Sequence, residues 1–223
     1  MQMSARNVVA KDAHEAVRGL RDGDTVMVGG FGGAGLPRAI IKAVVDLGVR
    51  DLTLISNNAG SGGDDLSLWF ASKRVRKIVC SYPRSADFFA EQYRAGTVEL
   101  ELVPQGTLVE RTRAGGAGLG GFLTPVGVGT IFAKGKETLK IDGKDYLLEK
   151  PLHANFAFLK GRQGDALGNV NYNKTARNHS VVMATAADVV AVEVAEVLEA
   201  GQMDPEGIVT PCIFVDRIFP SQP

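Results

Sequence analysis

The 223-residue sequence carries no excess of either charge, because its 25 lysines and arginines are balanced by 25 acidic residues. Proteins that bind nucleic acids usually display a strongly basic face, so this balance argues against a nucleic-acid partner. The sequence also lacks an apolar stretch long enough to span a bilayer, and its N-terminal MQMSARNVVAKDAHEAV lacks the apolar centre of a signal peptide. We therefore expect a soluble, cytoplasmic protein with no membrane partner.

Cysteine and histidine are scarce, with two and three residues. Cys80 and Cys212 each lie in a short apolar run, VRKIVC and CIFV, which is typical of reduced thiols buried in core strands. No Cys-x-x-Cys pair and no His/Cys spacing suits a metal ion, so no metal site is expected. Glycine, in contrast, is abundant with 27 residues. The glycines are clustered, so their positions are informative.

Short apolar runs alternate with amphipathic segments along the chain. The predicted strands are residues 25–28, 52–56, 75–81, 98–103, 156–160, 189–194 and 213–218, and the predicted helices are residues 11–20, 37–48, 66–71 and 85–95. This order predicts an α/β fold with an open, mostly parallel sheet and helices on both faces. Apolar and polar residues alternate over residues 137–148 on both sides of Asp142-Gly143, which predicts a β-hairpin insertion. Residues 114–121 and 126–129 contain too many glycines to form regular helices or strands. We expect one domain over residues 1–223.

The densest glycine cluster, residues 29–35, stands between the first strand and a helix that begins near Pro37. Such a loop places backbone N–H groups at the positive end of a helix, which favours phosphate, pyrophosphate or carboxylate. Its Gly30-x-Gly32-x-x-Gly35 spacing matches the dinucleotide-binding pattern, and a P-loop is excluded because no Gly-Lys-Ser/Thr follows. A purely structural role, in which the glycines allow a tight turn and close helix packing, is the alternative.

The residues after the second strand weigh against a dinucleotide. Such a site needs an acidic residue at the end of that strand to hold the ribose. Asn57 and Asn58 stand there instead, and Asp51 precedes the strand. Because open α/β sheets bind ligands at the carboxyl ends of their strands, we assign Asn57 and Asn58 to a substrate-binding loop, with simple turn residues as the alternative.

A longer pattern surrounds the glycine cluster. Residues 22–37 run DGDTVMVGGFGGAGLP, which resembles the first signature of the family I coenzyme A-transferases. Further blocks resemble the A (alpha) subunit of that family, in the family order: LTLISNNAG (52–60), VRKIVCSYPR (75–84), ELELVPQGTLVERTRAGGAGLGGFLTPVGVGT (99–130), GNVNYNKTARN (168–178) and DPEGIVTPCIFVDRI (204–218). The resemblance covers essentially residues 10–220. It is closest to the 3-oxoacid transferases, and PLHANFAFLKG (151–161) and SYPR look most like 3-oxoadipate:succinyl-CoA transferases. Acetate/acetoacetate and succinyl-CoA:3-ketoacid transferases are close alternatives.

The resemblance implies a two-part enzyme with a three-layer fold. In the family, a glutamate attacks the acyl-CoA thioester, and the reaction passes through an acyl-glutamyl anhydride and a glutamyl-CoA thioester. That glutamate belongs to a Ser-Glu-Asn-Gly motif of the B subunit, and the motif is absent from this sequence. The resemblance therefore implies a B-subunit partner, an A2B2 heterotetramer, and coenzyme A as a co-substrate with no permanently bound cofactor.

The resemblance also assigns roles to residues. Gln105, in Val-Pro-Gln-Gly, matches a family glutamine that lies beside the nucleophile and helps to hold the developing oxyanion; a capping or turn residue is the alternative. The loop residues expected to hold or position CoA and its acyl group are Gly29, Gly30, Phe31, Gly32, Gly33, Ala34 and Gly35.

Other residues receive weaker assignments. His14, His153 and His179 have no Ser or Cys nucleophile pattern beside them and are expected to be structural or solvent-facing. Arg177 could bind a substrate carboxylate or form a structural salt bridge, and the sequence leaves both roles open. The glycine-rich residues 114–130 could form an active-site loop or a subunit contact, and this choice also stays open. Two other classes of protein stay as alternatives: a dinucleotide-dependent oxidoreductase and a ligand-sensing module.

Overall fold

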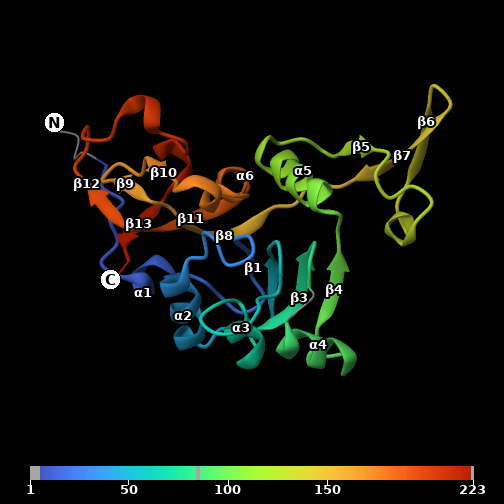
Figure 1. Ribbon diagram of the computed structural model, residues 1–223, viewed down its shortest axis with the longest axis horizontal. Helices are drawn as coiled ribbons and strands as arrows, with labels where there is room; N and C mark the ends of the chain where they lie inside the picture. The colour runs from blue at the N-terminus through green and yellow to red at the C-terminus, as the bar shows by residue number, and fades with distance from the viewer. Residues whose placement is uncertain (1–5, 84–85, 222–223) are drawn as a thin grey trace.

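A computed structural model describes residues 6–83 and 86–221 of the chain. Its centre is a seven-stranded sheet in which every recorded pairing is parallel (Figure 1). From one edge to the other, the strands are β13 (Arg217–Pro220), β11 (Ala187–Val194), β8 (Ala154–Lys160), β1 (Thr25–Val28), β2 (Leu52–Ile55), β3 (Val75–Cys80) and β4 (Glu99–Leu102). The central strands are short and apolar on both faces, which is typical of a parallel sheet that helices cover on both sides.

Helices lie on both faces of this sheet (Figure 1). One face carries α1 (Ala13–Ala16), α2 (Arg38–Leu47), α3 (Ser67–Ala71) and α4 (Asp87–Arg94), and the other carries α5 (Gln105–Gly116) and α6 (Ser180–Thr185). The first layer buries Ile40, Trp69 and Phe89 in one apolar cluster, and the second buries Leu108 and Met183 in another. The predicted α/β architecture with a mostly parallel sheet is therefore confirmed.

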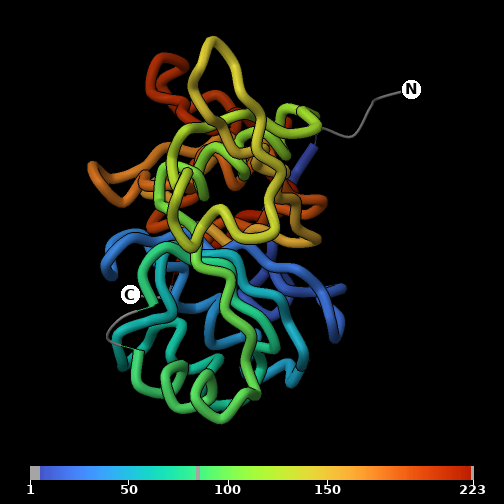
Figure 2. Tube along the Cα trace, turned by 90° about the vertical axis from the view of Figure 1, so that its right-hand side faces the viewer, coloured from blue at the N-terminus to red at the C-terminus, as the bar shows by residue number. Residues whose placement is uncertain are grey.

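Two small sheets extend the domain. An antiparallel sheet of β5 (Phe122–Thr124), β7 (Lys144–Glu149) and β6 (Thr138–Ile141) projects from one end of the molecule, and β10 (Val170–Asn171), β9 (Gln163–Asp165) and β12 (Glu196–Leu198) form the other sheet (Figures 1 and 2). The hairpin predicted around Asp142-Gly143 joins β6 to β7. Both turn residues have positive φ (48° and 79°), as the twist of a two-residue hairpin requires. Four short 3-10 turns complete the described elements: Ile131–Ala133, Lys174–Arg177, Pro205–Gly207 and Cys212–Phe214.

The glycine-rich segment 114–121 was expected to be irregular, and this expectation is wrong for its first part. Helix α5 continues through Gly115 and Gly116. A Cβ on Gly115 would overlap the carbonyl of Leu152, and one on Gly116 would overlap the side chain of Thr185. The two glycines therefore let the end of α5 pack directly on its neighbours, and this tertiary contact offsets their low helix propensity.

The ends of the chain also depart from the sequence prediction. Residues 213–218 do not form one strand, because a 3-10 turn at Cys212–Phe214 precedes β13. Cys212 is consequently half-buried, outside a core strand, whereas Cys80 is buried as expected. The helix predicted over residues 11–20 is reduced to the single turn of α1.

Two predicted positions lie outside the described residues. They are residue 85, the predicted start of the fourth helix, and residue 84 of the SYPR block.

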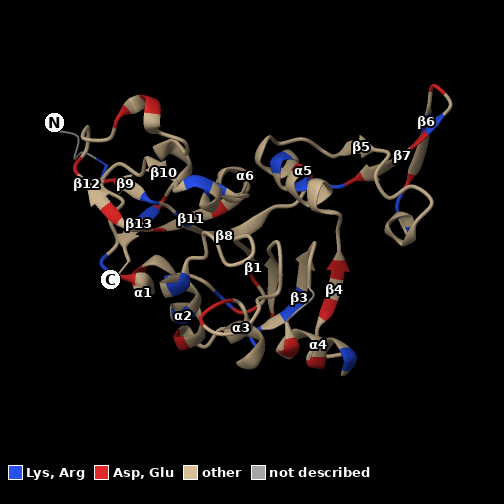
Figure 3. Ribbon diagram, viewed as in Figure 1, with Lys and Arg blue, Asp and Glu red and all other residues tan. Residues whose placement is uncertain are grey.

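Basic and acidic residues are interspersed over the elements, with neither sign confined to one face (Figure 3). Within the described part of the chain, no helix combines the length and the apolar character that crossing a bilayer requires.

Candidate functional site

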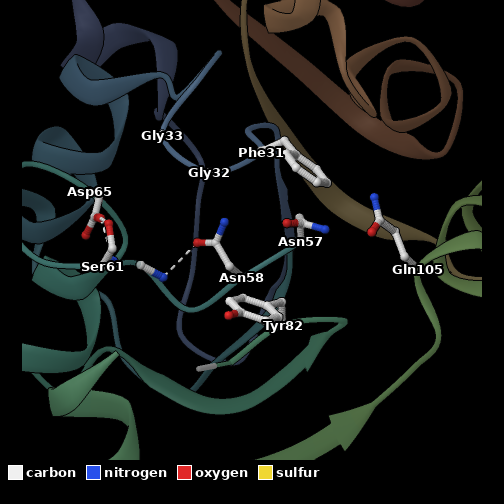
Figure 4. A pocket seen from close by; sticks show the side chains of 10 residues that line it. Phe31, Gly32, Gly33, Asn57, Asn58, Ser61, Asp65, Tyr82 and Gln105 are labelled. Atoms are coloured by element: carbon white, nitrogen blue, oxygen red, sulfur yellow. Dashed lines mark hydrogen bonds between the residues drawn. The ribbon is translucent and has the colours of Figure 1, made fainter. Parts of the chain in front are cut away.

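A cavity of about 410 Å³ lies at the carboxyl ends of four neighbouring parallel strands, β1 to β4. Its lining comes from the segments that follow those strands: Phe31, Gly32, Gly33, Asn57, Asn58, Gly60, Ser61, Asp65, Tyr82 and Gln105 (Figure 4). We call it the first cavity. Its position is the one at which open α/β sheets bind ligands. Gln105, Asn57, Asn58 and the tip of the glycine loop, which were singled out from the sequence, are brought together here.

The tip of the glycine loop is a tight turn. The N–H of Phe31 donates to the carbonyl of Ala34 (3.0 Å), and the N–H of Ala34 donates back to the carbonyl of Phe31 (3.0 Å). Gly32 and Gly33 between them have φ values of 55° and 91°, as in a type I′ turn, which disfavours residues with a Cβ at both positions. The turn leaves Phe31 46% exposed at the mouth of the first cavity.

The other glycines of the loop have packing roles. A Cβ on Gly29 would lie 2.9 Å from the Ser180 hydroxyl, and one on Gly30 would lie 2.5 Å from a methyl group of Leu36. A Cβ on Gly35 would overlap the carbonyl of Ala176. The structure thus divides the seven loop residues: Gly29, Gly30 and Gly35 allow close packing, and residues 31–34 are exposed where a ligand can meet them.

The helix terminus behind the loop is already occupied by a carboxylate of this chain. Glu193, at the end of β11, is 4% exposed and accepts the N–H of Ala39 in the first turn of α2 (2.9 Å). Its other oxygen pairs with Nζ of Lys160 (2.8 Å). The sequence pattern suggested an external anion at this terminus. The carboxylate of Glu193 takes the place of that external anion, because the helix dipole stabilises negative charge at the N-terminus of α2.

Asn57 and Asn58 shape the loop after β2 as well as lining the first cavity. The carbonyl of Asn57 accepts the N–H groups of Ser81 (3.1 Å) and Tyr82 (3.0 Å), which ties the end of β2 to the end of β3. Oδ1 of Asn58 accepts the N–H of Gly60 (2.9 Å), an interaction visible in Figure 4. The two asparagines therefore combine the turn role that was the alternative with a position facing the cavity.

Asp65 anchors the far wall of the first cavity. It accepts the N–H of Ser61 (2.7 Å) and both the N–H (2.8 Å) and the hydroxyl (2.6 Å) of Ser67. Burial by itself would raise the pKa of Asp65, but the hydrogen bonds from Ser67 and Ser61 outweigh it and hold the pKa below its usual range. Asp65 is thus an anion held by this chain, and it is not poised to donate a proton.

Gln105 is the first residue of α5 and has an exposed side chain. No side chain caps this helix, and its first turn contains no acidic residue. The N-terminus of α5 therefore differs from that of α2, which Glu193 fills. The positive end of the α5 dipole and the Gln105 amide both lie at the first cavity and favour negative charge that develops there (Figure 4).

A second cavity of about 410 Å³ adjoins the first, and the two share Phe31 and Gln105. The remaining lining is Ala34 and the segment between β10 and α6: Lys174, Thr175, Arg177, Asn178 and His179. Asn178 ties this segment to the glycine loop, since its Oδ1 accepts the N–H of Gly30 (3.2 Å) and its Nδ2 donates to the carbonyl of Ala34 (3.3 Å).

His179 lies edge-on to Phe31, with ring centroids 6.3 Å apart and an interplanar angle of 82°. Burial lowers the pKa of His179, which keeps the imidazole neutral near pH 7. His179 is therefore part of a cavity wall. His14 and His153 lie outside both cavities and are exposed, and each is within 4 Å of one aspartate, at 3.5 and 3.9 Å.

No glutamate is among the described residues that line either cavity. Glu101 and Glu149 are engaged elsewhere, Glu101 with Arg111 (2.7 Å) and Lys77 (2.7 Å), and Glu149 with Lys136 (2.5 Å). The described residues also contain no group of three or more His, Cys, Asp or Glu side chains arranged to hold a metal ion. The cavities thus offer amide donors and a helix terminus but no carboxylate nucleophile of the kind that the sequence resemblance requires.

Residues 10–221 match the family described as "Coenzyme A transferase". The chain belongs to the coenzyme A transferase family. It is 53% identical over 205 residues to the A subunit of 3-oxoadipate CoA-transferase from Pseudomonas putida, covering 91% of this chain and 89% of that one. It is 46% identical to the alpha subunit of acetate CoA-transferase from Escherichia coli, covering 91% and 92% of the two chains.

Solved structures show the same fold. An acyl-CoA transferase of Escherichia coli O157:H7 superposes with a TM-score of 0.88 at 20% identity, covering 99% of this chain and 48% of that chain. This transferase chain therefore spans about half the length of that structure's chain. The membership confirms the resemblance found in the sequence and removes the support for a dinucleotide-dependent oxidoreductase.

Several residues that line the two cavities of this CoA-transferase subunit were not singled out from the sequence. Tyr82, Ser61 and Asp65 line the first cavity, and Lys174 lines the second. Tyr82 stands just after β3, so the rule that singled out Asn57 after β2 also applies to it. Asp65 precedes Ser67 in an Asp-x-Ser pattern before a short helix, which is a helix-start pattern. Lys174 has no local pattern that distinguishes it.

Proposed function

We propose that this chain is the A subunit of a heteromeric 3-oxoacid CoA-transferase that moves CoA from succinyl-CoA to a 3-oxo acid, with 3-oxoadipate as the first candidate. Two relatives named as A subunits of 3-oxoadipate CoA-transferases, from Pseudomonas putida and Acinetobacter baylyi, support this substrate at 53% and 50% identity. Relatives named for acetate and for succinyl-CoA:3-ketoacid transfer, at 46% and 41% identity, supply the alternative substrates. Residues 1–223 then form the single domain of this A subunit, acting in the cytoplasm where CoA thioesters are made and used.

One observation carries the proposal: Gln105 lies where the two cavities meet, and the described lining of both cavities contains no glutamate. We infer that a B subunit brings a glutamate of a Ser-Glu-Asn-Gly motif to this point, in an A2B2 assembly. Its carboxylate oxygen forms a bond to the thioester carbonyl carbon, and the C–S bond breaks to release CoA thiolate and an acyl-glutamyl anhydride. The thiolate then attacks the glutamyl carbonyl of the anhydride, which releases the first acid and leaves a glutamyl-CoA thioester. The second acid takes CoA by the same two steps in reverse.

The role of Gln105 follows from the charges of these steps. Each addition places negative charge on a carbonyl oxygen, and an amide N–H aimed at that oxygen stabilises the transition state more than the uncharged ground state. A lysine or arginine at the same place would pair with the attacking carboxylate and stabilise the ground state as well. The described lining of the first cavity contains no lysine or arginine, and its only charged side chain is the already satisfied Asp65.

The absence of cations from the described lining of the first cavity limits what Phe31, Gly32 and Gly33 bind there. The phosphates of CoA favour basic groups or a free helix terminus. Glu193 occupies the terminus of α2, and the free terminus of α5 lies at Gln105, where the reacting carbonyl has to lie. We therefore propose that Phe31, Gly32, Gly33 and Ala34 contact the thioester end of CoA and its acyl group. The phosphates are then held outside the first cavity. CoA acts as a co-substrate.

Reconstitution tests the proposal. The purified chain alone is expected to show no transfer of CoA from succinyl-CoA to 3-oxoadipate, and activity is expected on addition of a B subunit with the Ser-Glu-Asn-Gly motif. Mass spectrometry after incubation with succinyl-CoA should find the CoA adduct on that glutamate of the B subunit. Transfer by the chain alone, or an adduct on the chain itself, would contradict the division of roles. Assays with 3-oxoadipate, acetoacetate and acetate decide between the substrate alternatives.

A further inference from the structure

The second cavity has a different charge from the first. Lys174 and Arg177 are the charged residues in its lining, and both are exposed. Among the described residues neither side chain forms an ion pair or a side-chain hydrogen bond, whereas Arg111 and Lys160 are both paired with glutamates. His179 adds no charge near pH 7, because burial lowers its pKa. The second cavity thus presents two cations with unused donors beside Gln105.

The segment that carries these cations has an unusual and well-fixed backbone. Lys174 and Asn178 have φ values of 50° and 31°, in the region that residues with a side chain seldom adopt. Hydrogen bonds between Asn178 and the glycine loop, and one from the N–H of Ala176 to the carbonyl of Asn173 (3.0 Å), hold the turn. Backbone strain of this kind persists where surrounding contacts over-determine it, and it is concentrated at binding sites.

We propose that Lys174 and Arg177 bind the distal carboxylate of a dicarboxylic acyl group whose reacting carbonyl lies at Gln105. This inference rests on the proposed transferase function and adds a substrate class to it. A succinyl group and 3-oxoadipate share a free carboxylate a few carbons from the reacting carbonyl, whereas acetate and acetoacetate have none. Because Gln105 lines both cavities, an acyl chain that reacts beside it can extend its far end into the second cavity. Arginine and lysine are suited to a carboxylate there through charge-assisted hydrogen bonds.

A phosphate of CoA is the other anion that this chemistry fits. The whole pantetheine arm separates the CoA phosphates from the sulfur, and the sulfur has to lie at the reacting carbonyl. The second cavity directly adjoins that point, so the geometry favours the short distance to a distal carboxylate. The two anions can be separated experimentally, because only one of them belongs to the acid substrate.

The test compares adipate with hexanoate as ligands of the reconstituted complex, since these acids have the same chain length and differ in the distal carboxylate. Calorimetry measures binding without turnover, so it reports on the cations even if the complex fails to transfer CoA. Wild type is expected to bind adipate at least about tenfold more tightly than hexanoate. Arg177→Gln and Lys174→Asn should each weaken adipate binding about 10- to 100-fold and leave hexanoate unchanged.

Lys73→Asn is the matched control. Lys73 is exposed, has a φ of 55° close to that of Lys174, and lies outside both cavities. Asparagine tolerates this backbone region, so both substitutions remove a charge with little added strain. The control should bind adipate as wild type does. If Arg177→Gln fails to fold, Lys174→Asn decides the question by itself.

Three results would overturn the inference. Wild type could bind hexanoate as tightly as adipate. The variants could weaken free CoA and leave adipate unchanged, which would assign the cations to a phosphate. They could also abolish assembly with the B subunit while the free chain stays folded, which would assign them to the interface. A fourth result would separate this inference from the proposed function. If the wild-type complex transfers CoA to none of the acids but still binds adipate more tightly than hexanoate, the proposed function is refuted and the assignment of Lys174 and Arg177 to a carboxylate is retained.

Discussion

Replacement of Gln105 by leucine removes an amide donor from the point where the two cavities meet and keeps a similar volume. The side chain is exposed and makes no hydrogen bond with the described part of the chain, so the free chain should lose less than about 0.5 kcal/mol of stability. The effect should instead appear in the reconstituted enzyme, where the partner subunit excludes water from the cavity and strengthens each electrostatic contact.

The size of the effect follows from the negative charge that we propose to develop beside Gln105. Removing one donor from a developing oxyanion costs about 2.7–4 kcal/mol of transition-state stabilisation, which corresponds to a fall of about 10²- to 10³-fold in kcat. The ground-state carbonyl is uncharged, so KM should change by less than about threefold.

Gln105→Glu separates catalysis from stability. A carboxylate in the first turn of α5 interacts favourably with the helix dipole and should stabilise the free chain by about 0.3–1 kcal/mol. The same carboxylate repels the attacking glutamate and the oxyanion, so kcat should fall at least as far as in Gln105→Leu. The measurements are urea denaturation of the free chain and steady-state kinetics of the complex with succinyl-CoA and 3-oxoadipate. A kcat within about threefold of wild type for Gln105→Leu would return Gln105 to a purely structural role.

Three further outcomes are expected from the free chain. Gly35→Ala should lower the free energy of unfolding, measured by urea denaturation, by at least about 2 kcal/mol, because the φ of Gly35 is 74° and a Cβ would overlap a neighbouring carbonyl. Gly32→Ala should lower it by only about 1 kcal/mol, because the space around Gly32 is open. Burial raises the pKa of Cys80 to about 12, so a thiol reagent at pH 8 should modify only the half-buried Cys212 in the native protein and both cysteines after unfolding; a second native modification would contradict the burial. Burial lowers the pKa of His179 from 6.5, so the unfolded chain binds the His179 proton more tightly than the folded chain does. The free energy of unfolding should therefore be greatest above about pH 6.5 and should decline as the pH falls through the lowered pKa. His179→Phe should remove that decline between pH 7 and 5, and an unchanged pH profile would show that another group causes it.

The strands of the large sheet were predictable because of the layers that cover them. A parallel strand buried on both faces is rich in apolar residues, as are β1 (TVMV), β2 (LTLI), the end of β3 (IVC) and the middle of β8 (FAFL). The C-terminus of α2 was predictable for a local reason too, since Gly48 adopts the left-handed conformation that ends a helix. Helix α5 was partly missed because Gly115 and Gly116 lower local helix propensity, and the contacts that require them come from residues much later in the chain.

The sequence by itself determined the parallel α/β sheet, the glycine loop at residues 29–35, the family, and the candidate residues at the ends of the strands. These features depend on neighbours in the chain, on side-chain periodicity and on the backbone freedom of glycine. Only the tertiary structure placed Glu193 on the N-terminus of α2, 154 residues away, and Asn178 on Gly30, 148 residues away. The first contact removes the anion site that the local pattern suggested, and the second brings Lys174 and Arg177 beside Gln105 to form the second cavity. Contacts of this kind depend on which strands lie side by side in the sheet, and the local pattern of residues around either partner does not record that order.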